Sequence, residues 1–177
     1  MATFSVNKIS FIIFLLVLLT GCNLDRKTEV DRKRFSFKAY ADTRTFFQNI
    51  RMYYYDREVI PNSEVVAFRF KARSKDSLHF KLQPTIVLNQ ANNDALLFLE
   101  STQPADSLTI AIGEQTFTLT DRNREKVLEF ATLIYEAIMT EKEIFLHPQV
   151  QPLFSHEEEK DNFRKVMSDY YRLTRVF

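Results

Sequence analysis

The chain has 177 residues, 45% of them hydrophobic, with 17 Phe and 7 Tyr. This composition provides for one ordinary domain with one packed core, and it excludes a chain that is disordered throughout. Lys and Arg number 24 and Asp and Glu 23, a balance that argues against a basic, nucleic-acid-binding surface. Gly21 and Gly113 are the only glycines, too few for a phosphate-binding loop or a dinucleotide fingerprint.

The first residues have the layout of a secretory signal. One positive charge, Lys8, precedes an unbroken apolar run from Phe11 to Leu19. This run is about half of the roughly 20 apolar residues that a bilayer-spanning helix needs, and charged residues resume at Asp25. A cleaved leader is therefore the better interpretation, and a permanent transmembrane helix the weaker one.

Residues 19–22, Leu-Thr-Gly-Cys, closely resemble the lipobox of bacterial lipoproteins. The resemblance implies a signal peptide over residues 1–21, cleavage between Gly21 and Cys22, and a diacylglyceryl group on the sulfur of Cys22. The new amine is often acylated as well, with palmitate or a similar fatty acid. Two or more acyl chains, at about 0.8 kcal/mol per buried CH₂, hold a protein stably on a membrane.

The same resemblance implies a location in the cell envelope. Asn23 stands where an Asp favours inner-membrane retention in the enterobacterial pattern, so the outer membrane is favoured if the cell is Gram-negative. Cys22 is the only cysteine, and its lipidation would leave none for a disulfide, a nucleophile or a thiolate metal site.

The residues after the lipobox divide into a short charged segment and one domain. Residues 22–34 hold the lipidated cysteine and a charged tether, which reaches up to about 40 Å when fully extended. Contact of Arg32-Lys33-Arg34 with anionic headgroups is possible on chemical grounds, but a soluble spacer is the favoured interpretation. Residues 35–177 form a single globular domain.

Between Phe35 and Thr120 apolar residues mostly recur at every second position, which is typical of half-buried strands. Pro84 interrupts one such segment or places it at a sheet edge. Gly113-Glu114 separates two alternating runs and predicts a β-hairpin, because glycine supplies the unusual backbone angle of the turn. The expected strands are 35–42, 66–73, 78–83, 86–88, 95–99, 108–112 and 117–119.

Residues 44–56 are compatible with either kind of element. Phe46 and Ile50 lie one helical turn apart, yet together with Met52 they also fit one face of a strand. The aromatic content favours the strand, which we predict.

The tyrosine runs at 53–55 and 170–171 offer rings for stacking on a sugar or other ligand. We favour the alternative, in which alternate tyrosines lie in the core and the rest on the surface.

The last third changes to helical spacing. Asp121 can cap a helix whose apolar face runs from Val127 to Met139. Ser155 and Glu158 have the spacing of a capping box at the start of a second helix, whose apolar stripe runs over residues 163–177. Strands followed by helices predict an α+β fold, with a mainly antiparallel sheet in the N-terminal two-thirds packed by two C-terminal helices.

No catalytic, cofactor-binding or metal-binding residue is predicted. The three histidines lack the spacing of a zinc site, and the Gly-x-Ser-x-Gly elbow of many hydrolases is missing from the sequence. A Ser-His-Asp triad assembled from distant residues is left open. The histidines are His79, predicted on the polar face of a strand, His147 in a loop and His156 at a helix start.

Arg69, Lys71 and Arg73 alternate with apolar residues and form the one candidate binding surface. Beside Lys81, they could make a basic strip on the open face of the sheet that binds an acidic partner or a polysaccharide. An ordinary solvated face is the favoured alternative.

The sequence therefore predicts a lipid-anchored envelope protein, attached to the membrane through Cys22, whose domain is a non-catalytic binding or structural module. Its partner would be an envelope protein or a polysaccharide, and not nucleic acid. Two alternatives stay open. One is a hydrolase of cell-wall or lipid material, and the other is a membrane-tethered inhibitor that sequesters a toxin or a foreign enzyme.

Overall fold

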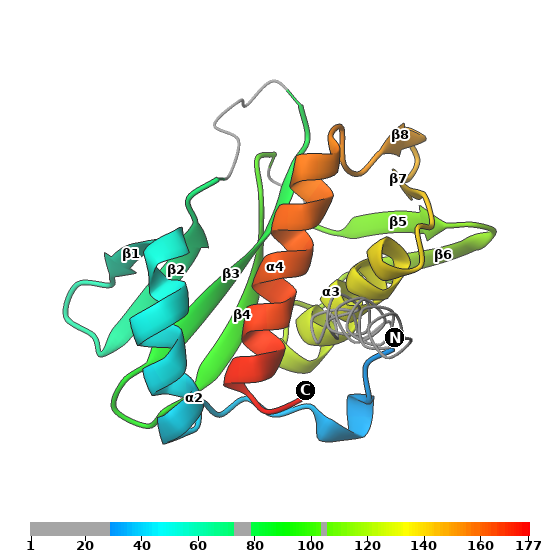
Figure 1. The fold of residues 1–177 in the computed structure, drawn as a ribbon. Helices are drawn as coiled ribbons and strands as arrows, with labels where there is room; N and C mark the ends of the chain where they lie inside the picture. Colours follow the sequence, from blue (N-terminus) through cyan, green and yellow to red (C-terminus); the bar gives the residue numbers. More distant parts are fainter. Residues whose placement is uncertain (1–28, 73–78, 104–105) are drawn as a thin grey trace, which may run out of the picture.

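The computed structural model describes residues 29–72, 79–103 and 106–177. Two antiparallel four-stranded sheets are packed by the two C-terminal helices, so the predicted α+β fold is confirmed (Figure 1). The predicted signal peptide, Cys22 and Arg73 lie outside the described residues.

The first sheet is a meander in which each strand runs antiparallel to the next, in the order β1-β2-β3-β4. The segments predicted as 78–83 and 86–88 are replaced by one strand that passes through Pro84. Pro84 lies beyond the last β2–β3 pair, Phe68 with Ile86, so its missing N–H removes no bond from that ladder. The strands are β1 (Tyr55–Val59), β2 (Val65–Phe70), β3 (Leu82–Asn89) and β4 (Ala95–Ser101).

The second sheet has the order β6-β5-β7-β8. The predicted hairpin forms one edge of it, β6 with β5, and is confirmed: Ile112 pairs with Gln115, and Gly113 adopts a φ of +60° in the turn. The proline-containing stretch before the last helix adds two short strands. The members are β5 (Leu108–Ile112), β6 (Gln115–Leu119), β7 (Ile144–Leu146) and β8 (Gln151–Pro152).

Both predicted C-terminal helices form, with different caps from those expected. Helix α3 (Arg124–Met139) is capped by Asn123, whose side chain accepts from the Lys126 N–H at 2.9 Å. The predicted cap, Asp121, instead accepts from the Asn123 N–H. At the start of α4 (Glu157–Leu173), the carboxylate of Glu159, and not the predicted Glu158, accepts from the Ser155 N–H at 2.8 Å.

The core fills the space between the sheets and the helices. Helix α4 contacts β3 and β4, while α3 contacts β4 and β6. The apolar stripe predicted for α4 is buried as expected, and this burial supplies most of the helix's stabilisation. The largest fully buried side chains include Tyr135, Tyr170, Tyr171, Phe47, Phe68 and Phe163.

Residues 41–54 are helical, so the predicted strand over 44–56 is wrong for all but its last two residues. The segment passes from α2 (Ala41–Phe46) through a π-helical turn, η2 (Phe47–Arg51), to a 3₁₀ turn, η3 (Met52–Tyr54). Buried or half-buried positions recur at helical spacing, at 43, 44, 47, 48, 51 and 52. Most of these carry polar or charged residues, whereas most aromatic residues of the segment lie outside. The aromatic content of this segment therefore predicted a strand where the structure has a helix.

The strand expected over 35–42 is also replaced. Residues before α2 are extended, but only Lys38 forms a bridge, opposite Asp94. The backbone N–H of Ala95 donates to Phe37 O, and that of Ala39 donates to Asn93 O. The segment is thus hydrogen-bonded to the start of β4 over a few residues but does not form a strand.

A buried ionic cluster joins the α2–η3 segment to α4. The carboxylate of Asp169 accepts from Arg51 Nε at 2.8 Å and from the Tyr55 hydroxyl at 2.7 Å. Asp169 is 2% exposed, and its burial raises the pKa of the carboxyl despite both hydrogen bonds, which act in the opposite direction. Removing one member of such a cluster leaves a charge or a polar group buried without its partner.

We expect Asp169→Ala to lower the free energy of unfolding by about 3 kcal/mol, and Asp169→Asn to lower it less, because the amide oxygen still accepts a hydrogen bond. Because the native pKa is raised, the native state binds this proton more tightly than the unfolded state. Stability should therefore fall as pH rises from 3.8 through the raised pKa, and Asp169→Asn should flatten this dependence. Urea unfolding measures both effects. An equal loss in the half-exposed control Asp161→Ala would contradict this account.

Candidate functional site

The two faces of the first sheet differ in how they are covered. Val66, Phe68 and Phe70 of β2 point to the side occupied by α2 and α4, which lie in front of the sheet in Figure 1. Arg69 and the other outward residues of β2 belong to the opposite face. A groove of about 960 Å³ lies there, and we call it the sheet-face groove.

The floor of the sheet-face groove is mainly apolar. Phe98 of β4 is 48% exposed within it, and Ile60, at the end of β1, is 36% exposed. An exposed aromatic ring on an apolar floor is the kind of feature that marks the centre of many protein interfaces. The groove is lined by Ile60, Val65, Ala67, Val87, Phe98 and Leu99, with Arg69, Glu100, Ser101, Asp106 and Arg122 as polar members.

Arg69 occupies one end of the groove between two carboxylates. Its guanidinium donates to both oxygens of Glu100, at distances of 2.7–2.9 Å, and also binds Glu58. The hydrogen bonds with Glu100, followed by those with Glu58, raise the pKa of Arg69. Two acids thus offset its charge, and the charged groups that line the groove balance, with two basic and two acidic side chains.

A narrower pocket of about 250 Å³ adjoins the groove. Phe98, Leu99, Ser101 and Arg122 line both spaces. Its other walls are buried apolar side chains from β3, β5, β6 and α3, so it offers a more enclosed apolar site than the groove itself. These are Leu82, Leu108, Leu119 and Val127.

The described residues of the predicted basic strip make different contacts. Arg69 lies in the groove, whereas Lys71 follows β2 and places its ammonium 4.9 Å from the ring centroid of Tyr53. Arg73 lies outside the described residues. Lys81 is 7% exposed and its Nζ lies 3.3 Å from Glu159 of α4. The role of Arg69, Lys71 and Arg73 in binding stays a prediction.

The histidines occupy separate elements. His156 is the N-cap residue of α4, as its predicted position at a helix start requires. His147 follows β7, outside the strands, as predicted. The prediction for His79 is wrong, because this residue lies in a bend before β3 and not on a strand. Within residues 29–72, 79–103 and 106–177, no three His, Cys, Asp or Glu side chains form a group suited to a metal ion.

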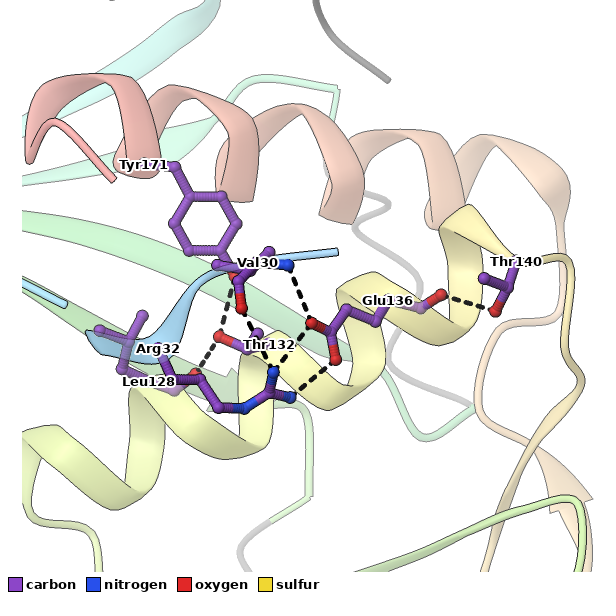
Figure 2. A network of polar contacts seen from close by, with 7 residues as sticks. All are labelled: Val30, Arg32, Leu128, Thr132, Glu136, Thr140 and Tyr171. Carbon is purple, nitrogen blue, oxygen red and sulfur yellow. Dashed lines mark hydrogen bonds and ion pairs between the residues drawn. The ribbon is translucent and has the colours of Figure 1, made fainter. Parts of the chain in front are cut away.

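The end of the predicted tether is bound to the domain. Residues 30–34, the N-terminal strap, lie against α3 (Figure 2). Val30 is 2% exposed, and its N–H donates to Glu136 Oε1 at 3.1 Å. Arg32 makes a two-pronged ion pair with the same carboxylate, at 3.0 and 2.7 Å. Part of the segment expected to be a solvated spacer is therefore folded structure.

The strap lies where α3 packs on α4. Beside it, the Tyr171 hydroxyl and Thr132 Oγ1 are 2.9 Å apart, and Thr132 donates to Leu128 O at 2.6 Å (Figure 2). Arg34 donates to Arg175 O at 2.8 Å, which ties the other end of the strap to the C-terminal residues. The strap thus fixes where the chain from Cys22 enters the domain.

The sequence carried only weak signals of these sites. A period of two puts Phe98 on the opposite face from Leu97 and Leu99, but all three are apolar, so the pattern does not tell which face is buried. Val30 is the only apolar residue between Asp25 and Arg34, which is the one sign of a contact within the predicted spacer. The pairing of Arg69 with Glu58 and Glu100 depends on strand register, which the sequence did not indicate.

Comparisons of this chain with protein families, with curated proteins and with solved structures found no match. Across the ranges that the structure describes, the helices lack the combination of length and apolar character needed to cross a membrane.

We expect Glu136→Ala to release the strap, because it removes the acceptor of both the Val30 N–H and the Arg32 side chain. Hydrogen–deuterium exchange at the Val30 amide should become much faster, while the core strands keep their protection. Glu129→Ala, on the exposed side of the same helix, is the matched control. Unchanged exchange at Val30 in Glu136→Ala would show that this carboxylate does not hold the strap.

Proposed function

We propose that this protein is a lipid-anchored component of a bacterial envelope whose domain binds another envelope protein through the sheet-face groove. The anchoring part rests on residues 19–22 and their resemblance to a lipobox. The binding part rests on one observation above all: Phe98 is half exposed on an apolar floor, on the face that the helices leave open.

The chemistry of the groove favours an apolar, uncharged segment of the partner. Arg69 is neutralised by Glu58 and Glu100, so an acidic ligand would compete with two carboxylates already in place. A polysaccharide surface usually offers several amphipathic rings and polar groups. This floor is instead aliphatic around the single ring of Phe98. A protein segment with one or two apolar anchors fits it better, and the adjoining pocket can take such an anchor.

A photo-cross-linking amino acid at position 98 of the full-length protein, expressed in its own envelope, tests the proposal. We expect one main cross-linked product, containing an envelope protein joined through an apolar segment. The same substitution at Thr116, which is exposed on β6 of the second sheet, is the control and should not give that product. Adding Arg69→Glu, which reverses the charge at one end of the groove, should reduce the product.

Two results would contradict the proposal. If positions 98 and 116 give the same products, contact at the groove is not specific. If position 98 gives only cross-links to lipid or glycan, the partner is not a protein.

A further inference from the structure

We infer that the exposed side of the α2–η3 segment rests on the surface of the anionic bilayer into which the lipid of Cys22 is inserted. This inference rests on the anchor in the proposed function and adds an orientation to it. The surface consists of Tyr40, Phe46, Ile50, Tyr53 and Tyr54, and we call it the aromatic face.

The aromatic face is unusual for a helical segment of a globular domain. Tyr53 is 78% exposed and Ile50 is 53% exposed, while the other three side chains are 40–46% exposed. These five make up most of the nine large hydrophobic side chains that the described residues expose. The covered side of the segment carries mostly polar residues. An amphipathic helix normally turns its apolar side to the core, so an outward apolar side calls for another surface.

Each tyrosine of the aromatic face has a cation at its ring. The guanidinium of Arg175 lies 4.2 Å from the ring centroid of Tyr40, and that of Arg51 lies 4.9 Å from Tyr54. The ammonium of Lys71 lies 4.9 Å from Tyr53. Amphipathic rings beside basic side chains are the residues that sit at the headgroup level of a bilayer, where the cations meet lipid phosphates.

The position of the strap also favours a bilayer as the surface that the aromatic face contacts. Arg34 of the strap donates to Arg175 O, and Arg175 in turn contacts both Tyr40 and Asp42. The strap thus runs from Val30, which is bound to Glu136 of α3, to Arg34, which lies beside one end of the aromatic face. Val30 lies eight positions after Cys22, with seven residues between them, which limits the reach from lipid to strap to roughly 28 Å. A domain held so close to a bilayer must turn one side to it.

A second copy of the chain is a poorer occupant. A symmetric dimer through the aromatic face would bring Lys71 against the same cation of the second copy, and Arg51 and Arg175 are already bound to Asp169 and Asp42. Asp42 is the only acidic residue among residues 40–54, and it is already bound to Arg175 at 2.7 Å. The groove lies on the opposite side of the first sheet, so a domain resting on its aromatic face would keep the groove open to a protein partner.

Tryptophan fluorescence can test this orientation, because the chain contains no tryptophan. The full-length lipoprotein carrying Tyr53→Trp is reconstituted into vesicles of phosphatidylcholine and phosphatidylglycerol with brominated acyl chains, which quench tryptophan on contact. Phe98→Trp, in the sheet-face groove, is the matched control. Both positions are exposed, so neither change should disturb folding.

We expect quenching in Tyr53→Trp to be several-fold stronger than in Phe98→Trp. Adding Lys71→Glu to Tyr53→Trp should weaken the quenching, whereas Lys142→Glu, in the loop after α3, should leave it unchanged. Vesicles of phosphatidylcholine alone should give weaker quenching than vesicles with the anionic lipid, because the cations lose their phosphate-rich surface.

The test separates this inference from the proposed function. Protein that sediments with the vesicles but shows equal quenching in the two tryptophan variants overturns the orientation and leaves the anchor intact. A self-association that protects Tyr53→Trp without quenching overturns it in favour of a second copy. Protein that fails to sediment with the vesicles refutes the anchor, and with it the orientation, whereas partner binding at the groove is tested separately by cross-linking.

Discussion

The whole structure depends on the burial of one side of α4. Tyr170 donates to Ala95 O of β4 at 3.1 Å, and Tyr171 is hydrogen-bonded to Thr132 of α3. Asp169 accepts hydrogen bonds from Arg51, in η2, and from Tyr55, the first residue of β1. The last helix in the chain thus bonds to the first sheet, to α3 and to the α2–η3 segment. Because it completes contacts that lie far apart in the sequence, we expect folding to be cooperative.

The sequence predicted those parts of the fold in which apolar periodicity and burial agree. The stripe of α4 and the hairpin around Gly113 are examples, because each residue type there fits both its local geometry and its place in the core. The prediction failed for residues 44–54, where the covered side of the helix is polar. Phe47 is the one buried side chain of this segment, with its ring centroid 5.3 Å from those of Tyr55 and Phe68, and Met52 packs against the core from a half-buried position. Asp169, which is distant in sequence, satisfies Arg51 on that side, and no local pattern reveals such a partner.

The candidate site was predictable only in part. Alternation placed Arg69 on an outward position, whereas Phe98 lies in an apolar run that gives no such sign. Their meeting in one groove follows from the order and register of β2, β3 and β4. Lys81, expected beside Arg69 and Lys71, is buried and pairs with Glu159 of α4. The difference between a basic strip and a neutral groove thus comes from tertiary pairing.

The strap, the aromatic face and the groove together describe how an anchored domain could work. The strap begins on Glu136 of α3 and ends at Arg175, which contacts Tyr40 at one end of the aromatic face. The groove lies across the sheet from both. An anchor attached in this way limits the orientations of the domain and presents one surface to partners, which raises the chance of productive encounters at a membrane.

Every functional proposal made for this chain begins at Cys22. The most direct measurement is the intact mass of the protein extracted from cell membranes, followed by mass spectrometry of its N-terminal peptide. The account predicts a chain that begins at Cys22 and carries a diacylglyceryl group on the sulfur, with the mass of residues 1–21 missing. An unmodified Cys22 with residues 1–21 still attached would contradict it.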